Sequence, residues 1–219
     1  MQTGGWLGFM GFLLLFAAND WRWGQAWSFL AIFAVGSIAF GAWLLRRDPA
    51  LLASRLGPFA QRGQPRWDRI LLPTFIAIWC GWLVLMALDA RRWHTSEVPR
   101  PLNVLGGALV ITGFLLTALV LRENSFAEPV VRVQTERGQR VIDTGPYAVV
   151  RHPMYASSLL YLVGMPLLLG SWYGLLIVPL MILVMAPRAV FEERLLKREL
   201  PGYAAYMTRV RHRLIPGVW

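Results

Sequence analysis

Two polar clusters in the last third of the chain carry side chains that could bind a ligand. The first cluster is Arg151-His152-Pro153-Met154-Tyr155, with Tyr147 just before it, and the second runs from Arg188 to Glu193. If the clusters meet, one pocket holds a histidine, two tyrosines, two carboxylates and two arginines. That combination of opposite charges and aromatic rings suits a ligand that is both zwitterionic and aromatic.

The segment between the clusters predicts how they meet. Residues 155–169 and 172–186 are apolar and uncharged, and a Gly170-Ser171 turn joins them. Two antiparallel helices joined by a short turn form a hairpin whose free ends lie side by side. We therefore predict that Tyr155 and Glu192 share one cavity. Pro187 is expected to bend the exit from the hairpin, so that a separate charged helix follows over 188–199.

The composition indicates that lipid surrounds these elements. Of the 219 residues, 56% are hydrophobic and only 16% are charged, which is too much apolar surface for one soluble domain to bury. A crossing of a hydrocarbon core of roughly 30 Å needs about 20 apolar residues. Three stretches meet that length and three are shorter: 26–45, 70–88 and 102–121, then 4–18, 155–169 and 172–186. The predicted fold class is an all-α, polytopic integral membrane protein with about six hydrophobic helices. The shorter stretches either span or dip into the bilayer.

Basic residues predict the orientation in the membrane. The net charge is +10, and the 22 Lys and Arg residues alternate between rich and poor connections. Six lie in 46–69, five in 122–151 and seven after 187, against one in 19–25, three in 91–100 and none at 170–171. Six crossings with both termini in the cytoplasm satisfy the positive-inside rule. The charge is thereby explained without nucleic acid, and the Arg-rich, Lys-poor usage favours a bacterial inner membrane.

The chain divides into two regions of different character. Residues 1–121 are predicted to form transmembrane helices, with glycines at 4, 5, 8 and 11 and at 106, 107 and 113 spaced for close helix packing. The stretch 4–18 is expected to be a retained helix, because no Lys or Arg precedes it and residues 16–20 make a poor cleavage site. Residues 122–219 hold the polar loop, the hairpin and a basic, aromatic tail. No Cys or His spacing suits a metal site.

The C-terminal region resembles a known family. The pattern is Gly145-Pro146-Tyr147-x-x-x-Arg151-His152-Pro153-x-Tyr155, the hairpin, Arg188-x-x-x-Glu192-Glu193, Tyr203-x-x-Tyr206 and Arg213-Leu214-Ile215-Pro216-Gly217. It resembles the isoprenylcysteine carboxyl methyltransferase family, and the related phospholipid N-methyltransferases share part of it. The resemblance covers about residues 122–217, and the amino-terminal spans match only in being hydrophobic.

The resemblance implies a membrane methyltransferase that uses S-adenosylmethionine. Carried over by position, the cofactor-binding residues are Gln134, Gln139, Arg140, Val141, Ile142, Tyr147, His152, Pro153, Met154, Tyr155 and Glu192. Arg188 matches the catalytic position that faces the methyl acceptor. The acceptor is expected to be lipidic or amphipathic, reaching the site through the bilayer while the cofactor arrives from the cytoplasm.

The side-chain chemistry agrees with these roles. Glu192 can bind cationic or hydroxyl groups, His152 and loop amides can bind a carboxylate, and Tyr147 and Tyr155 offer aromatic faces to a sulfonium. Methyl transfer requires alignment more than acid or base catalysis, so the lack of a catalytic dyad is no objection. Arg188 suits a carboxylate acceptor, whereas an amine acceptor would need a base that is not evident.

Simpler explanations exist for each residue. Arg151 and His152 could snorkel at a helix start, and Arg188–Glu192 and Glu193–Lys197 could be ordinary i,i+4 pairs on an exposed helix. For Tyr203 and Tyr206 the preferred interpretation is interfacial anchoring, within a tail that lies on the lipid headgroups. Independent simple causes would not reproduce one family's spacing at both ends of a hairpin, so we favour the methyltransferase for the other residues.

Two further functions are also compatible with the sequence. One is an NADPH-dependent membrane reductase, because sterol reductases resemble this family in their C-terminal half. The other is a non-catalytic membrane helper or carrier, for which changing Glu192 or His152 would leave function intact. Cofactor binding distinguishes these hypotheses.

Overall fold

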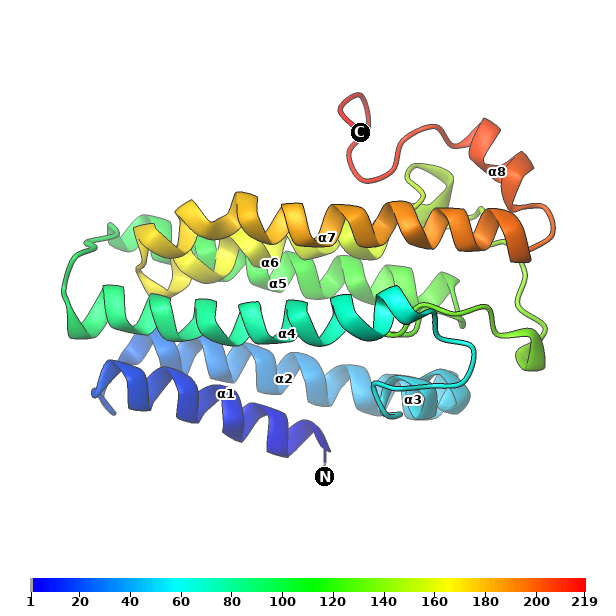
Figure 1. Ribbon diagram of the computed structural model, residues 1–219. Coiled ribbons are helices and arrows are strands. Elements are labelled where there is room, and N and C mark those ends of the chain that lie inside the picture. The colour runs from blue at the N-terminus through cyan, green and yellow to red at the C-terminus, as the bar shows by residue number, and fades with distance from the viewer. Residues whose placement is uncertain (1) are drawn as a thin grey trace.

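A computed structural model describes residues 2–219 (Figure 1). Its helices are α1 (Gln2–Ala18), α2 (Gly24–Arg47), α3 (Pro49–Arg55), α4 (Arg66–Ala87), α5 (Arg100–Glu123), α6 (Pro153–Leu169), α7 (Trp172–Glu199) and α8 (Tyr203–Arg209). A π-helical turn (Leu88–Arg92) extends α4, and two 3-10 turns (Thr135–Arg137, Gly145–Ala148) lie in the loop between α5 and α6. The described residues contain no strand, and the predicted all-α class is confirmed.

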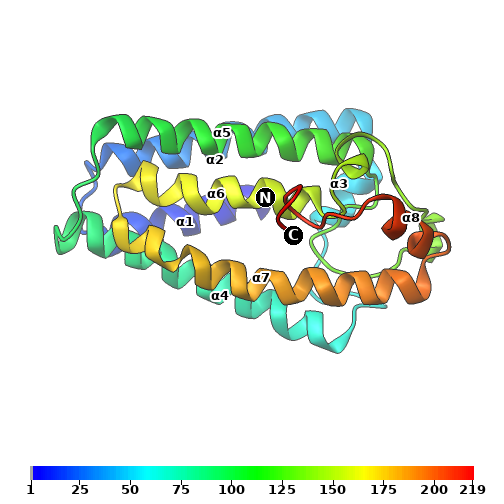
Figure 2. The ribbon, with the colours of Figure 1, turned by 90° about the horizontal axis from the view of Figure 1, so that it is seen from above.

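The long helices lie side by side along one axis (Figures 1 and 2). Four of them are long and apolar enough to cross a membrane: α2, α4 with its π-helical turn, α5 and α7. Helices α1 and α6 are apolar but shorter, with 17 residues each. The protein is therefore an integral membrane protein, and the three long predicted spans are confirmed.

The longer polar segments gather at one end of the bundle. Helix α3, the α5–α6 loop and α8 lie together there, while the opposite end carries the tight α6–α7 turn and the α4–α5 connection (Figures 1 and 2). The predicted hairpin of α6 and α7 is confirmed, and its free ends point to the end with the long loops. We call this end of the bundle the loop end.

Helix α7 differs from its prediction. It runs unbroken from Trp172 to Glu199 with Pro179 and Pro187 inside it, so the predicted separate helix over 188–199 is wrong. A proline removes one backbone donor, but helices buried among other helices in an apolar environment tolerate that loss. Contacts made by Arg188 and Glu193 beyond Pro187 hold the last turns in the same helical course.

Close packing of α5 against α6 places the start of α6. A Cβ added at Gly106 would lie 2.3 Å from the Leu168 backbone nitrogen and 2.6 Å from the Gly164 carbonyl oxygen, so only glycine fits. The Gly106 and Gly113 positions confirm the predicted packing role, since a Cβ at Gly113 would press on the Tyr161 ring at 3.1 Å. The same prediction for glycines 4, 5 and 8 of α1 is wrong, because a Cβ added there would meet nothing within 4 Å. The division of the chain at residue 121 stays a prediction.

A buried carboxylate fixes the turn of the hairpin at the other end. Asp89 is fully buried and accepts hydrogen bonds from the hydroxyls of Thr95, Ser96 and Ser171 at 2.5–2.6 Å. The Tyr173 backbone amide adds a bond of 3.2 Å. With its oxygens satisfied, the carboxylate joins the end of α4 to the α6–α7 turn.

A candidate cofactor cavity between the hairpin ends and the α5–α6 loop

A cavity lies at the loop end of the bundle, where α6 begins and α7 ends. All predicted site residues except Gln134 line it: Gln139, Arg140, Val141, Ile142, Tyr147, His152, Pro153, Met154, Tyr155, Arg188 and Glu192. The remaining wall comes from the loop segment 124–132 and from apolar and aromatic residues of α7, α8 and the turn between them. We call it the cofactor cavity, after the cofactor that the sequence resemblance predicts for it.

The contact between the hairpin ends is direct. The Tyr155 hydroxyl donates to Glu192 Oε2 at 2.8 Å, and the His152 and Tyr155 rings lie 5.3 Å apart. The predicted meeting of the start of α6 with the end of α7 in one cavity is confirmed. An aromatic ring and a carboxylate thus line the same wall.

Arg188 is held by groups that the sequence did not single out. Its Nε donates to Asp68 at 2.8 Å, its Nη1 to the Tyr155 hydroxyl at 3.0 Å and its Nη2 to the Pro129 carbonyl at 2.5 Å. Asp68 is fully buried and also accepts from Gln64 and from the Val131 amide. Arg188 therefore joins α4, the loop and α6. The sequence did not predict a role for Asp68, because this residue lies in the first half of the chain, 120 residues from Arg188.

Glu193 joins the hairpin to the tail. It is 3% exposed, and its oxygens lie 2.6 Å from Arg151 Nε and 2.9 Å from Arg213 Nε. Arg151 also donates to the carbonyls of Val210 and Arg211, both at 2.7 Å. Arg151 is thus a buried structural residue, so the snorkelling explanation is wrong. Neither i,i+4 pair, Arg188–Glu192 or Glu193–Lys197, is present among the ion pairs of the described residues.

The tail folds over the cavity, which corrects its prediction. Tyr203 and Tyr206 are buried cavity-lining residues, not interfacial anchors, and the Tyr206 hydroxyl donates to the Tyr147 carbonyl at 2.8 Å. The amides of Arg151 and His152 donate to the carbonyls of His212 and Arg213 at 2.9 Å. These bonds and the buried aromatic area favour the folded-back tail over one spread on headgroups.

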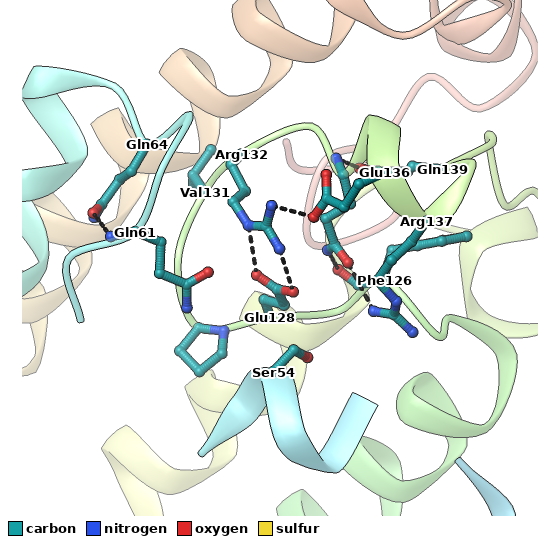
Figure 3. Close-up of polar contacts among 12 residues, drawn as sticks. Ser54, Gln61, Gln64, Phe126, Glu128, Val131, Arg132, Glu136, Arg137 and Gln139 are labelled. Atoms are coloured by element: carbon teal, nitrogen blue, oxygen red, sulfur yellow. Dashed lines mark hydrogen bonds and ion pairs between the residues drawn. The ribbon is translucent and has the colours of Figure 1, made fainter. Parts of the chain in front are cut away.

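Gln134 shapes the loop instead of lining the cavity. It is 1% exposed, donates to the Phe126 carbonyl at 2.8 Å and accepts from Arg137 at 2.7 Å. In the same loop Arg132 lies between Glu128 and Glu136 and forms an ion pair with each (Figure 3). The Gln134 backbone amide donates to the Gln139 side chain at 2.7 Å. Gln134 therefore positions Gln139, which lines the cavity, without lining it itself.

The residues of the cavity wall include a tyrosine that stays uncharged and two side chains with an atom that lacks a hydrogen-bond partner. The Tyr147 hydroxyl accepts from Asn124 at 2.7 Å, and burial raises the pKa of this phenol, which stays neutral. His152 Nε2 and the Tyr203 hydroxyl are buried without a hydrogen-bond partner, although His152 Nε2 lies 3.3 Å from Glu193. Unpaired buried polar groups are costly, so a polar ligand at this wall would gain contacts.

Comparison with protein families agrees with this geometry. Residues 102–201 match the family model described as phospholipid methyltransferase. The match begins in α5 and covers the loop and the whole hairpin, which are the elements that build most of the cavity. The resemblance predicted from the sequence is confirmed, and the family supports a membrane methyltransferase.

A curated relative has a different description. The chain is 27% identical over 165 residues to the cobalt-zinc-cadmium resistance protein CzcN of Cupriavidus metallidurans, a match that covers 74% of this chain and 68% of the relative. In the part of the chain that the structure describes, no group of three or more His, Cys, Asp or Glu residues could hold a metal ion. The relative's description therefore adds no site to this structure.

Proposed function

We propose that the protein is an S-adenosylmethionine-dependent methyltransferase that acts on an amphipathic acceptor at the cytoplasmic face of a bacterial inner membrane. The observation that carries the proposal is the Tyr155–Glu192 contact inside a cavity lined by the residues of the family pattern. The orientation, with both termini in the cytoplasm, rests on the basic residues of the loop end.

The cavity wall fits the parts of this cofactor. Glu192 is a carboxylate whose second oxygen is free to accept from an amino or hydroxyl group. His152 and Tyr203 line the cavity, and their polar side chains suit the polar atoms of the amino-acid head or ribose. Val141, Ile142 and other apolar side chains suit an adenine ring. Tyr147 and Tyr155 are aromatic rings near which a sulfonium is stabilised.

The roles of the residues are binding and alignment. S-Adenosylmethionine supplies a methyl group on a positively charged sulfur, so a carboxylate oxygen would form the new C–O bond while the electrons of the broken C–S bond stay on sulfur. No proton moves in that reaction. Arg188 remains our candidate for the acceptor side of the cavity, where it also fixes Tyr155 through their 3.0 Å hydrogen bond. Alignment of this kind contributes much of the rate in reactions without acid–base steps.

Calorimetric titration of the purified protein with S-adenosylmethionine and with NADPH tests the proposal. We expect S-adenosylmethionine to bind, and Glu192→Gln to weaken binding at least about tenfold, because a charge-assisted hydrogen bond is replaced by a neutral one. Glu199→Gln is the matched control, since Glu199 lies on the same helix, outside the cavity, and forms an exposed pair with Arg198. Binding of NADPH without S-adenosylmethionine would overturn the proposal, as would unchanged affinity in Glu192→Gln.

A further inference from the structure

A second cavity lies between the helices beside the cofactor cavity and opens to the surface of the bundle. Its volume is about 470 Å³, and its wall comes from α2, α3, α4, α5 and α6. Most of the lining is apolar or aromatic: Phe33, Phe40, Leu44, Leu52, Leu56, Phe75, Trp79, Phe114, Leu121, Met154, Leu162 and Met165. The others are Ser37, Gly41, Thr117, Ser158, Tyr161 and Arg55. We call this space the inner chamber. A hydrocarbon group would be well solvated by such a wall.

Arg55 is the single charged residue in the described lining of the inner chamber. Its Nη1 donates to the Ala127 carbonyl at 2.7 Å, and it forms no ion pair with a carboxylate of the described residues. The side chain is only partly buried, because the chamber reaches it. Burial nevertheless lowers the pKa of this guanidinium, and this effect outweighs the opposite influence of Tyr147, Tyr161 and the Glu128 carboxylate, none of which forms an ion pair with Arg55. The remaining guanidinium donors are available to a ligand.

The inner chamber and the cofactor cavity share a wall. Met154 lines both spaces, and the Ala127 carbonyl that accepts from Arg55 belongs to a residue lining the cofactor cavity. A ligand held by Arg55 would therefore lie close to the cofactor cavity, with its apolar part directed into the bundle.

We propose that the inner chamber holds the apolar body of a hydrophobic anion and that Arg55 binds its oxyanion group, a carboxylate or a phosphate. A lone guanidinium above an apolar chamber selects such a ligand, because an amine or a second cation would be repelled and an uncharged chain would leave the charge unpaired. Asp68 already neutralises Arg188, so Arg188 would position Tyr155 on the acceptor side while Arg55 binds the oxyanion. Arg55 lies outside the segment that matches the family model. That this ligand is the methyl acceptor rests on the proposed function. The binding of a hydrophobic anion in the inner chamber does not depend on that function.

Binding of four radiolabelled probes to the purified protein tests the role of Arg55. The probes are palmitate, hexadecyl phosphate, hexadecanol and hexadecylamine, which share a chain and differ in the head group. We expect one or both anions to bind more tightly than the alcohol and the amine, and the better anion identifies the head group. Arg55→Gln keeps a donor for the Ala127 carbonyl but removes the charge, and we expect it to weaken anion binding about tenfold while leaving hexadecanol unchanged. Arg62→Gln, at an exposed residue that lines neither cavity, is the control.

A second variant tests the chamber itself. Gly41 lines the chamber, and a Cβ there would meet nothing within 4 Å, so a side chain can be added at this position and Gly41→Leu would take up space in the chamber. Gly81→Leu is the matched control, because Gly81 has the same open surroundings on the exposed face of α4. We expect Gly41→Leu to weaken binding of both palmitate and hexadecanol and to leave S-adenosylmethionine binding unchanged.

The outcomes separate this inference from the proposed function. Equal affinity for palmitate and hexadecylamine, or anion binding that Arg55→Gln leaves intact, would overturn it even if S-adenosylmethionine binds. Conversely, selective anion binding that depends on Arg55 would support it even in a protein that binds no S-adenosylmethionine. Loss of cofactor binding in Gly41→Leu would show that the two spaces are one and would also contradict it.

Discussion

The adjacent carboxylates Glu192 and Glu193 have different surroundings. Glu192 lines the cofactor cavity and accepts one hydrogen bond from Tyr155. Glu193 does not line that cavity and lies between Arg151 and Arg213. The sequence predicted the position of Glu192 because topology alone brings it to Tyr155. It did not predict the partners of Glu193 or Asp68, since a carboxylate's partner far along the chain leaves no local pattern.

We expect Glu193→Gln to destabilise the protein rather than its ligand binding. The change leaves Arg151 and Arg213 without a counter-charge in a buried position, a loss of about 3 kcal/mol or more. In a thermal unfolding measurement in detergent this corresponds to an apparent Tm lower by roughly 5–10 °C. Glu199→Gln, at an exposed residue of the same helix, should leave Tm within about 1–2 °C. An unchanged Tm for Glu193→Gln would mean that this ion-pair cluster does not hold the tail.

Among the elements, the apolar spans were predictable and the course of α7 was not. A long stretch without charges identifies a span, because a helix needs about 20 apolar residues to cross the hydrocarbon core. Helices α2, α4 and α5 follow that rule. The uninterrupted α7 depends on tertiary contacts beyond Pro187, which no local signal contains. The tail's aromatic residues were also misassigned, because the same residues suit a headgroup layer and a cavity wall.

The contact between α5 and α6 gives a prediction for these two helices. Gly106→Ala should be strongly destabilising, because its new Cβ would lie within 3.0 Å of backbone atoms of α6 that cannot move independently. Gly107→Ala is the matched control: its Cβ would meet Leu168 at 3.6 Å, an ordinary contact, and alanine has the better helix propensity. Thermal unfolding in detergent should show a lower Tm for the first change and an equal or higher one for the second. The opposite order would mean that the helices are not in this register.

On the scale of the whole molecule, the arrangement follows from two physical demands. Apolar helices must cross lipid in alternating directions, and polar segments must lie outside it. Together they gather α3, the α5–α6 loop and α8 at one end (Figure 1). The two cavities adjoin there, since Met154 lines both. The positive-inside pattern predicted which connections share a side. The inner chamber was not predicted, because its lining is spread over five helices whose packing is set only by the fold.

The orientation of the bundle decides whether the cofactor cavity can meet a cytoplasmic nucleoside, and it can be tested directly. In a background in which Cys80, the one cysteine, is replaced by alanine, we would introduce Thr135→Cys in the α5–α6 loop and Glu97→Cys at the opposite end. Both positions are exposed, so a membrane-impermeant maleimide can reach whichever faces it. We expect intact bacterial cells, with a permeabilised outer membrane, to label Glu97→Cys, and Thr135→Cys to react only after the inner membrane is opened. Arg62→Cys, in the α3–α4 connection at the loop end, should behave like Thr135→Cys. The reverse pattern would place the cavity on the side without S-adenosylmethionine, and the proposed methyltransferase would then lack access to its methyl donor.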